Sequence, residues 1–219
     1  MTDEARKIRL LMRLREAGIR DTGVLSAMEK VPRELFVAGG FEDQAYEDRA
    51  LPIDCGQTIS QPHVVAAMTE ALEVETGHTV LEIGTGSGYQ AAVLAPLCRR
   101  LYTVERHADL LRAAEERFAK LGLHRIVTRR GDGAAGWPEQ APFDRILVTA
   151  AAAEIPAALV AQLTPDGLLV LPVGRDGRDQ TLMRVRRKED GYVSEELFSV
   201  RFVPLLPGRP RAPRAAAGD

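Results

Sequence analysis

Apolar residues recur at helical spacing in the first third of the chain. From residue 3 to about 18 they stand three and four positions apart, which predicts an amphipathic helix. A second, short helix is predicted over 22–30. It should end there because the next residue, Val31, precedes Pro32 and is therefore pushed out of the helical region. The stretch 42–61 is rich in Asp, Gly and Pro without clear periodicity, and predicts a loop with one short strand. A further helix is predicted to begin at Pro62.

Beyond residue 76, strand-like runs alternate with helical stretches. Five strands are predicted over 79–83, 100–104, 125–129, 145–149 and 168–172, with helical stretches over 89–95, 108–121 and 156–163. Such alternation implies parallel strands joined by right-handed crossovers, and therefore the α/β class with a doubly wound, mostly parallel sheet. Two more runs, 180–186 and 192–202, have short connections and predict antiparallel strands at the edge of the same sheet.

The chain length fits one domain. We expect a single domain over 1–206, with a helical cap and loop over 1–75 and the sheet over 76–206. In residues 207–219 proline and arginine replace apolar residues, which predicts a disordered tail.

Composition narrows the class of protein. A formal net charge of -2 argues against a nucleic-acid partner, and no apolar stretch approaches the ~20 residues that cross a bilayer. The charged N-terminus lacks the apolar stretch of a signal peptide, and two cysteines, Cys55 and Cys98, are too few for a disulfide framework. We therefore expect a cytoplasmic protein with no membrane partner. Asparagine is absent and lysine is scarce, which a biased source genome explains.

A glycine-rich turn follows the first predicted strand of the sheet. Gly84, Gly86 and Gly88 alternate with other residues after Glu82, at the position where α/β sheets bind nucleotides. Glycine is needed there because a side chain would keep the backbone away from a ligand. The alternating spacing is the form found in methyltransferases and differs from the Gly-x-Gly-x-x-Gly of dinucleotide sites. Glu82 is expected either to steady the loop or to meet the positively charged methionine end of the cofactor.

Acidic residues follow the next two strands. Glu105 is placed where a carboxylate can accept hydrogen bonds from both hydroxyls of a ribose. Asp132, with Gly133 beside it, is placed to meet an adenine amino group. Together with the glycine turn, these residues predict a site for S-adenosyl-L-methionine, the methyl donor, and for its product S-adenosyl-L-homocysteine. No metal is expected.

Several separate stretches between Ile19 and Pro204 resemble the protein-L-isoaspartate O-methyltransferase family. They are Val31 to Val37, Ala45 to Ile53, Gly56 to Pro62, Glu82 to Gln90, Gly131 to Gly133, Gly136 to Pro138, Ala141 to Asp144, Val148 to Ala152, and Leu171 to Gly174. The segment from Gln57 to Pro62 is the most diagnostic of these. The chain departs from the family pattern at Asp54-Cys55, where we expect a buried, inert thiol, and at Asp166-Gly167-Leu168.

The resemblance implies an enzyme that methylates the free carboxylate of L-isoaspartyl residues, and of D-aspartyl residues as a further option, in damaged proteins. It assigns the active-site serine to Ser60, and it implies that Gln57 and Thr58 close over the cofactor. The acceptor carboxylate is already an anion, so no general base is needed, and Ser60 suits the role of hydrogen-bond donor. The N-terminus of the helix that begins at Pro62 is expected to help hold the anion. The alternative interpretation makes Ser60 a helix N-cap.

Other functions stay open or are disfavoured. A nucleic-acid N-methyltransferase would need an Asn/Asp-Pro-Pro-aromatic segment after the fourth strand, where this chain has Thr149 followed by four alanines. A methyltransferase for a small-molecule acceptor would keep every cofactor feature, and a non-catalytic adenosyl-binding module would bind the cofactor without turnover. We expect a monomer whose partners are isoaspartyl-containing proteins and peptides.

Overall fold

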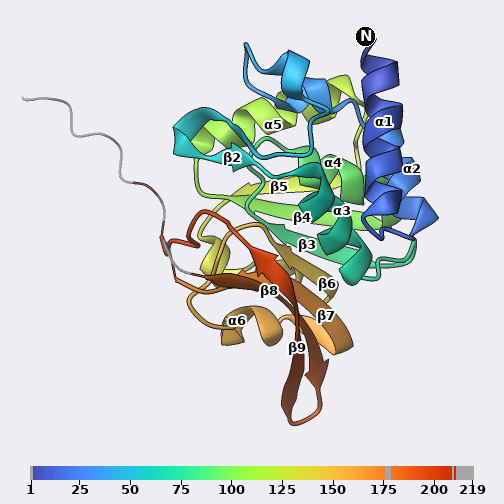
Figure 1. Ribbon diagram of the computed structural model, residues 1–219. Helices are drawn as coiled ribbons and strands as arrows, with labels where there is room; N and C mark the ends of the chain where they lie inside the picture. The colour runs from blue at the N-terminus through green and yellow to red at the C-terminus, as the bar shows by residue number, and fades with distance from the viewer. Residues whose placement is uncertain (1, 176–178, 209, 211–219) are drawn as a thin grey trace, which may run out of the picture.

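A seven-stranded sheet forms the centre of the molecule in the computed structural model, which describes residues 2–175, 179–208 and 210 (Figure 1). In spatial order the strands are β5 (Ile126–Arg130), β4 (Arg100–Glu105), β3 (Thr79–Ile83), β6 (Phe143–Val148), β7 (Leu163–Val173), β8 (Gln180–Lys188) and β9 (Gly191–Val200). The pairs from β5 to β7 are parallel, and β8 and β9 are antiparallel. The predicted α/β fold class and its antiparallel edge are confirmed.

The N-terminal cap consists of α1 (Asp3–Glu16), α2 (Thr22–Lys30) and α3 (Pro62–Ala71). Side chains at the helix starts satisfy backbone N–H groups there: Asp21 accepts from Val24 N at 3.0 Å at the start of α2. Between α2 and α3, the chain forms a small hairpin of β1 (Leu51–Pro52) and β2 (Thr58–Ile59), so the predicted loop contains two very short strands.

Apolar side chains cover both faces of the sheet, as a buried parallel sheet requires. Alternate residues of a strand point to opposite faces, and Val80 and Leu101 accordingly join one cluster while Leu81 and Tyr102 join the other. Helices α1 to α3 pack on the first face with α4 (Tyr89–Leu94) and α5 (Ala108–Lys120). The second face is covered by α6 (Ala157–Val160) and by Trp137 and Ala141 from the segment between β5 and β6.

The largest departure from the predicted elements lies before the fifth parallel strand. A helical stretch was expected over 156–163, but α6 spans four residues and β7 already begins at Leu163. Leu163 pairs with Phe143 and Leu168 with Arg145, so residues 164–167 bulge out of the sheet. Asp166 has a φ of 57°, a left-handed conformation that periodicity alone does not reveal.

Most of the predicted tail, residues 209 and 211–219, lies outside the described residues. Within the described part of the chain, no helix is long and apolar enough to cross a membrane.

Candidate active site

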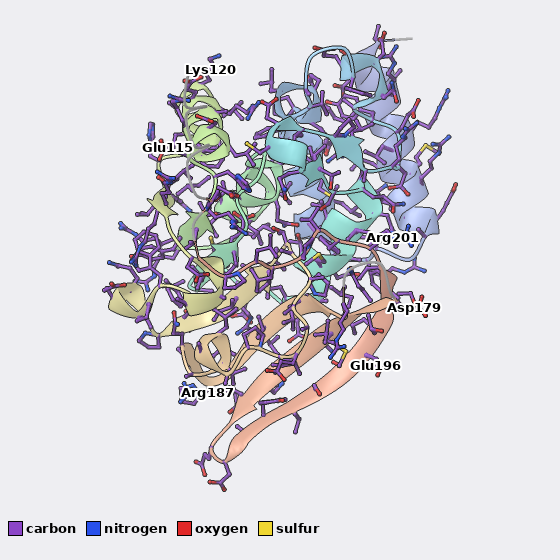
Figure 2. The ribbon with its side chains drawn as sticks, turned by 90° about the vertical axis from the view of Figure 1, so that its left-hand side faces the viewer. Glu115, Lys120, Asp179, Arg187, Glu196 and Arg201 are labelled. Carbon is purple, nitrogen blue, oxygen red and sulfur yellow. The ribbon has the colours of Figure 1, made fainter. Side chains whose placement is uncertain are left out.

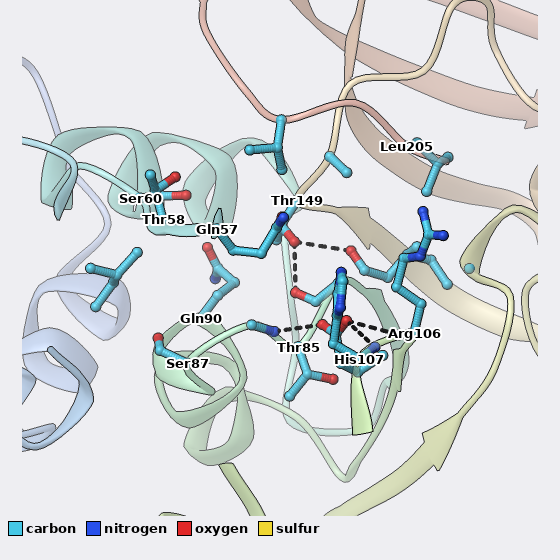
Figure 3. A pocket seen from close by; sticks show the side chains of 18 of the residues that line it. Gln57, Thr58, Ser60, Thr85, Ser87, Gln90, Arg106, His107, Thr149 and Leu205 are labelled. Carbon is cyan, nitrogen blue, oxygen red and sulfur yellow. Dashed lines mark hydrogen bonds between the residues drawn. The ribbon is translucent and has the colours of Figure 1, made fainter. Parts of the chain in front are cut away.

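A cavity opens at the carboxyl ends of the central strands, where the strand order reverses at β3. Ligands of open α/β sheets bind at this switch point. The cavity is open to solvent on one side, and its lining combines polar groups with apolar side chains, as is typical of small-molecule sites. Figure 3 shows side chains from three regions around it: Ser60 and Thr58 from the loop before α3, Arg106 and His107 after β4, and Leu205 from the C-terminal segment.

The glycine turn forms the floor of this cavity. Gly84, Gly86 and Gly88 have φ values of 95°, 53° and 90°, a region in which residues with a Cβ are strained. Gly84 also leaves room for Thr149, whose hydroxyl donates to the carbonyl oxygens of Ile83 at 3.0 Å and Gly84 at 2.7 Å. Gly84 and Gly86 line the cavity, whereas Gly88 lies behind it.

Gly88 instead permits close packing under the turn. A Cβ added there would stand 2.8 Å from Cε1 of Phe118 and 3.1 Å from Cβ of Ala114, both on α5. The three predicted glycines therefore serve two purposes: two leave space for a ligand, and the third lets α5 approach the start of α4.

Glu105 ties the glycine turn to the end of β4. One carboxylate oxygen accepts from Gly86 N at 2.9 Å, and the other accepts from Arg106 N at 2.8 Å and His107 N at 2.9 Å. Only 5% of the residue is exposed, yet it lines the cavity. A carboxylate oxygen can accept more than one hydrogen bond, so the group remains able to accept from a ligand's hydroxyls.

Glu82 lies beneath the turn and does not line the cavity. Its carboxylate accepts from the Thr103 hydroxyl at 2.5 Å, and Thr103 lies 2.6 Å from the Thr85 hydroxyl, so the chain of bonds ends in the turn. Burial raises the pKa of the Glu82 carboxyl to about 8; the Thr103 hydrogen bond opposes this rise and the charge of Glu105 adds to it. Of the two expected roles, this geometry supports steadying the loop.

Asp132 is also outside the cavity lining, while its neighbour Gly133 is part of it. The Asp132 carboxylate accepts from Ala134 N at 2.9 Å and from Gly208 N at 2.7 Å. Asp132 therefore anchors the C-terminal segment, a contact that was not expected. Because the Asp132 side chain does not line the cavity, the structure gives no support to its expected contact with adenine.

The C-terminal segment itself forms one wall of the cavity. Val203, Pro204, Leu205 and Leu206 all line it. Backbone hydrogen bonds hold the segment to the loop after β6: Leu205 N donates to Ala151 O at 2.7 Å, and Ala151 N donates to Val203 O at 2.8 Å. Sequence reasoning missed this wall, although the apolar run just before the expected tail was a signal.

The loop before α3 supplies the opposite wall, with Gln57, Thr58 and Ser60 in the lining. A turn with positive φ at Cys55 (57°) and Gly56 (66°) reverses the chain ahead of them. Cys55 is exposed, so the expectation of a buried thiol is wrong. Desolvation and nearby carboxylates raise the pKa of the Cys55 thiol, which disfavours the reactive thiolate.

Arg33 holds the backbone of Ser60. This fully buried side chain donates from Nη2 to Ser60 O and from Nε to Ala45 O, both at 2.8 Å. Its guanidinium carbon lies 4.6 Å from the ring centre of Tyr89, the first residue of α4. Arg33 therefore connects the Ser60 loop to the helix that follows the glycine turn, a link that no local pattern predicted.

The start of α3 differs from both expectations for it. Its N-cap is Gln61, so the interpretation of Ser60 as the N-cap is wrong. Asp48 accepts from His63 N at 2.8 Å and from the Gln61 side-chain amide at 3.0 Å. Since a carboxylate already occupies the helix end, the expected holding of the acceptor's anion there is not supported. Among the described residues the Ser60 hydroxyl has no hydrogen-bond partner, which leaves it available to a ligand in the cavity.

Among the described residues, no group of three or more His, Cys, Asp or Glu side chains is arranged to hold a metal ion. The side chains present fit an adenosyl cofactor: a glycine floor without Cβ atoms, a carboxylate at Glu105, and apolar walls.

Known proteins resemble this chain throughout its length. A family model described as protein-L-isoaspartate(D-aspartate) O-methyltransferase matches residues 5–209. A Rhodospirillum rubrum protein named protein-L-isoaspartate O-methyltransferase is 63% identical over 220 residues, which cover 100% of both chains.

Two solved structures share the fold. One, named protein-L-isoaspartate O-methyltransferase, has a TM-score of 0.82 at 28% identity, and the match covers 90% of this chain but 65% of that longer one. The other is a putative protein-L-isoaspartate O-methyltransferase from Plasmodium falciparum in complex with S-adenosyl-L-homocysteine. Its TM-score is 0.76 at 27% identity, with 90% of this chain and 97% of that one covered.

Proposed function

Since the chain belongs to the protein-L-isoaspartate (D-aspartate) O-methyltransferase family, we propose that it transfers the methyl group of S-adenosyl-L-methionine to the free α-carboxylate of L-isoaspartyl residues in damaged proteins. The observation that carries the proposal is the position of Ser60. Its unpartnered hydroxyl borders the same cavity as the glycine turn and Glu105, so acceptor and cofactor groups can meet there.

The proposed reaction needs no proton transfer by the protein. An α-carboxyl group has a pKa near ~3.5 and is an anion at neutral pH, so no general base is required. The cofactor, when bound, supplies an electrophilic methyl group. The protein's task is to orient the carboxylate and exclude water, and Ser60 donates a hydrogen bond to one carboxylate oxygen while the other oxygen attacks.

Each side of the cavity has a distinct task in this proposal. Glu105 and the floor formed by Gly84 and Gly86 bind the ribose side of the cofactor. The C-terminal segment with Leu205 supplies an apolar wall that keeps water out. Arg33 keeps Ser60 at the acceptor side through the Ser60 carbonyl.

The methyl ester explains how such a transfer repairs protein. The backbone nitrogen that follows the esterified residue attacks the ester carbonyl, methanol leaves, and a succinimide ring forms. Water then opens the ring at either carbonyl, and opening at the side-chain (β) carbonyl restores the normal aspartyl linkage, whereas opening at the α-carbonyl gives isoaspartate again. Residues that remain isoaspartyl re-enter the cycle.

A pair of peptides tests the proposal directly. The isoaspartyl form of a peptide should be labelled by methyl-labelled cofactor and release volatile methanol after mild base, whereas the aspartyl form should not. The carboxylate differs in position by one methylene, and a misplacement of about 1 Å can reduce the rate roughly 10²-fold. Equal labelling of both peptides, or labelling only of a small-molecule acceptor, would refute the repair function.

The role of Ser60 is tested with Ser60→Ala. Turnover should fall about 10²-fold or more, as loss of a transition-state donor typically does, while S-adenosyl-L-homocysteine affinity measured by calorimetry stays within a few-fold. Full turnover in this variant would refute the assigned role. In the same calorimeter the wild-type protein should bind both adenosyl compounds and not NAD; the reverse result would overturn the cofactor assignment.

Activity on D-aspartyl residues, the lack of a metal requirement, the monomeric state and the cytoplasmic setting stay predictions. A D-aspartyl peptide in the same assay, a chelator control and sedimentation of the purified protein test the first three.

A further inference from the structure

The chain itself contains Asp–Gly, the aspartyl sequence that most readily forms isoaspartate. An aspartyl side chain can be attacked by the backbone nitrogen of the next residue, and glycine in that position offers no Cβ to hinder the attack. Because the chain has no asparagine, any isoaspartate in it must begin at an aspartate. Four Asp–Gly pairs occur, at 132–133, 166–167, 176–177 and 190–191. The pair at 176–177 lies outside the described residues.

Packing protects the pair at Asp132. Both carboxylate oxygens accept hydrogen bonds, from Ala134 N and Gly208 N. Gly133 packs so closely against Ile83 that even a Cβ would clash with its side chain. Ring closure would require the carboxyl carbon to leave both donors and approach Gly133 N in a place without room to move.

An ion pair protects Asp166. Lys188 Nζ lies 2.5 Å from its carboxylate. The Lys188 hydrogen bond, together with the lysine's charge, holds the pKa of the Asp166 carboxyl below its usual value. Cyclisation must expel water from the carboxyl group, which an ionised carboxylate resists. Gly167 is also confined, since a Cβ added there would lie 2.9 Å from Thr164 O.

The pair Asp190–Gly191 has neither kind of protection. Glu189 and Asp190 form the turn of the β8–β9 hairpin, and both are exposed. Across the described chain, the Asp190 carboxylate has no hydrogen bond or ion pair. Gly191 pairs with Lys188 at the start of β9, but it has a φ of 125° and nothing within 4 Å of an added Cβ, so no neighbouring side chain obstructs the approach of the Asp190 carboxyl to Gly191 N.

We infer that Asp190 is a damage site of this protein and that the protein is its own substrate there. Gly191 N attacks the Asp190 side-chain carboxyl, water leaves, and the succinimide that forms takes up water to give isoaspartate. The enzyme then methylates the α-carboxylate that this linkage frees, releasing S-adenosyl-L-homocysteine. Gly191 N displaces methanol, the succinimide re-forms, and hydrolysis returns aspartate. This inference rests on the proposed function.

The fold requires a second copy to perform this repair. Val173, at the carboxyl end of β7, pairs with Thr181, whereas Leu168 pairs with Arg186 and the turn lies beyond it. The cavity is at the carboxyl ends of the parallel strands, so the turn lies at the opposite edge of the sheet. Eight residues of β8 separate the two edges, about 26 Å at roughly 3.3 Å per residue. The hairpin projects from the body in both views (Figures 1 and 2), which makes its tip accessible to another molecule.

Ageing the protein tests the inference. Heavy-nitrogen-labelled protein is kept for weeks at neutral pH without cofactor, then mixed with a small amount of fresh unlabelled enzyme and methyl-labelled S-adenosyl-L-methionine. Trypsin releases the peptide Glu189 to Arg201, in which Asp190 is the only aspartate. Its isoaspartyl and aspartyl forms separate by reversed-phase chromatography. We expect isoaspartate to accumulate at residue 190, the methyl label to appear on the heavy peptide, and labelling to scale with the amount of fresh enzyme.

Repair should then be visible as loss of the isoaspartyl form. Prolonged incubation with the cofactor should lower it about tenfold or more, because enzyme turnover of about 1 s⁻¹ or faster outpaces a cyclisation that takes days. The matched control Asp190→Glu keeps the charge and the hairpin but cannot form the five-membered ring, and its aged peptide should take no label. Glu189→Gln changes the same turn and should label like the wild type.

The outcomes separate this inference from the proposed function. A synthetic isoaspartyl peptide is assayed beside the aged protein. Two outcomes would refute the inference alone. In both, the synthetic peptide is labelled; in the first the aged protein contains no isoaspartate at residue 190, and in the second it contains isoaspartate there that takes no label. Failure to label either acceptor, with isoaspartate present at residue 190, would refute the proposed function. Label confined to the peptides that contain Asp132, Asp166 or Asp176 would refute the choice of site.

Discussion

The buried carboxyl of Glu82 should make the stability of this protein fall as the pH rises. Burial raises the pKa of Glu82 from 4.5 to about 8 in the folded protein, whereas the unfolded chain exposes an ordinary glutamate. The folded state therefore holds a proton that the unfolded state releases between these two values. The stability contribution of Glu82 is complete below pH 4.5 and is lost as the pH rises to about 8.

The magnitude follows from the size of the pKa difference. Each unit corresponds to about 1.4 kcal/mol, so the full change is about 3–5 kcal/mol. Glu82→Gln replaces the protonated carboxyl by a neutral amide of the same shape, and its carbonyl can still accept from Thr103. We expect variant and wild type to have similar free energies of unfolding below pH 4.5. At pH 8 the variant should be more stable by about 3–5 kcal/mol.

Urea unfolding across this pH range measures the difference. With a slope of about 1–3 kcal/mol per M, the midpoint of the variant should exceed that of the wild type by about 1–3 M at the alkaline end. Other titrating groups act on both proteins equally and cancel in the difference. The exposed Glu116→Gln serves as the control and should follow the wild-type profile. Parallel profiles for wild type and Glu82→Gln, or a wild type that is the more stable at pH 8, would contradict the assigned protonation state.

Three further substitutions test contacts of the site. Glu105→Gln removes the charged acceptor of three backbone N–H groups and leaves at least one of them facing an amide NH2 instead of an oxygen, at a cost of about 1.5–3 kcal/mol. Calorimetry should therefore show S-adenosyl-L-homocysteine binding about 10–100-fold weaker; unchanged affinity would argue against a cofactor role. Arg33→Lys loses the forked contact with two carbonyls and should lower the free energy of unfolding by about 1–3 kcal/mol. We expect kcat to fall by a larger factor than cofactor affinity; an equal fall in kcat and in cofactor affinity would indicate a purely structural role. Gly88→Ala should lower the free energy of unfolding by about 2–4 kcal/mol, because the position has a positive φ and an added Cβ would press on Phe118. The control is Gly77→Ala, where an added Cβ meets no atom within 4 Å; similar urea midpoints for the two variants would refute this prediction.

Some of the site could be predicted because its parts are local or follow from topology. The glycine turn is contiguous in sequence, and parallel strands bring their carboxyl ends to one edge, which places Glu105 beside Gly86. Other contacts could not be predicted in this way. Asp48 caps α3 from thirteen to fifteen residues away, and Asp132 binds Gly208 across 76 residues. These contacts depend on how separate segments meet, which periodicity does not encode.

The sequence by itself determined the elements, their alternation and the chemistry near the first strand, because hydrophobic periodicity and glycine spacing act over a few residues. Only the tertiary structure decided which polar groups already have hydrogen-bond partners within the protein and which remain available to a ligand. It placed Asp48 at the helix end expected to hold the acceptor's anion, buried Glu82 under the turn, and left the Ser60 hydroxyl facing the cavity. The physical reason is that burial and hydrogen-bond satisfaction are set by all neighbours of a group in space, most of which are distant in the chain.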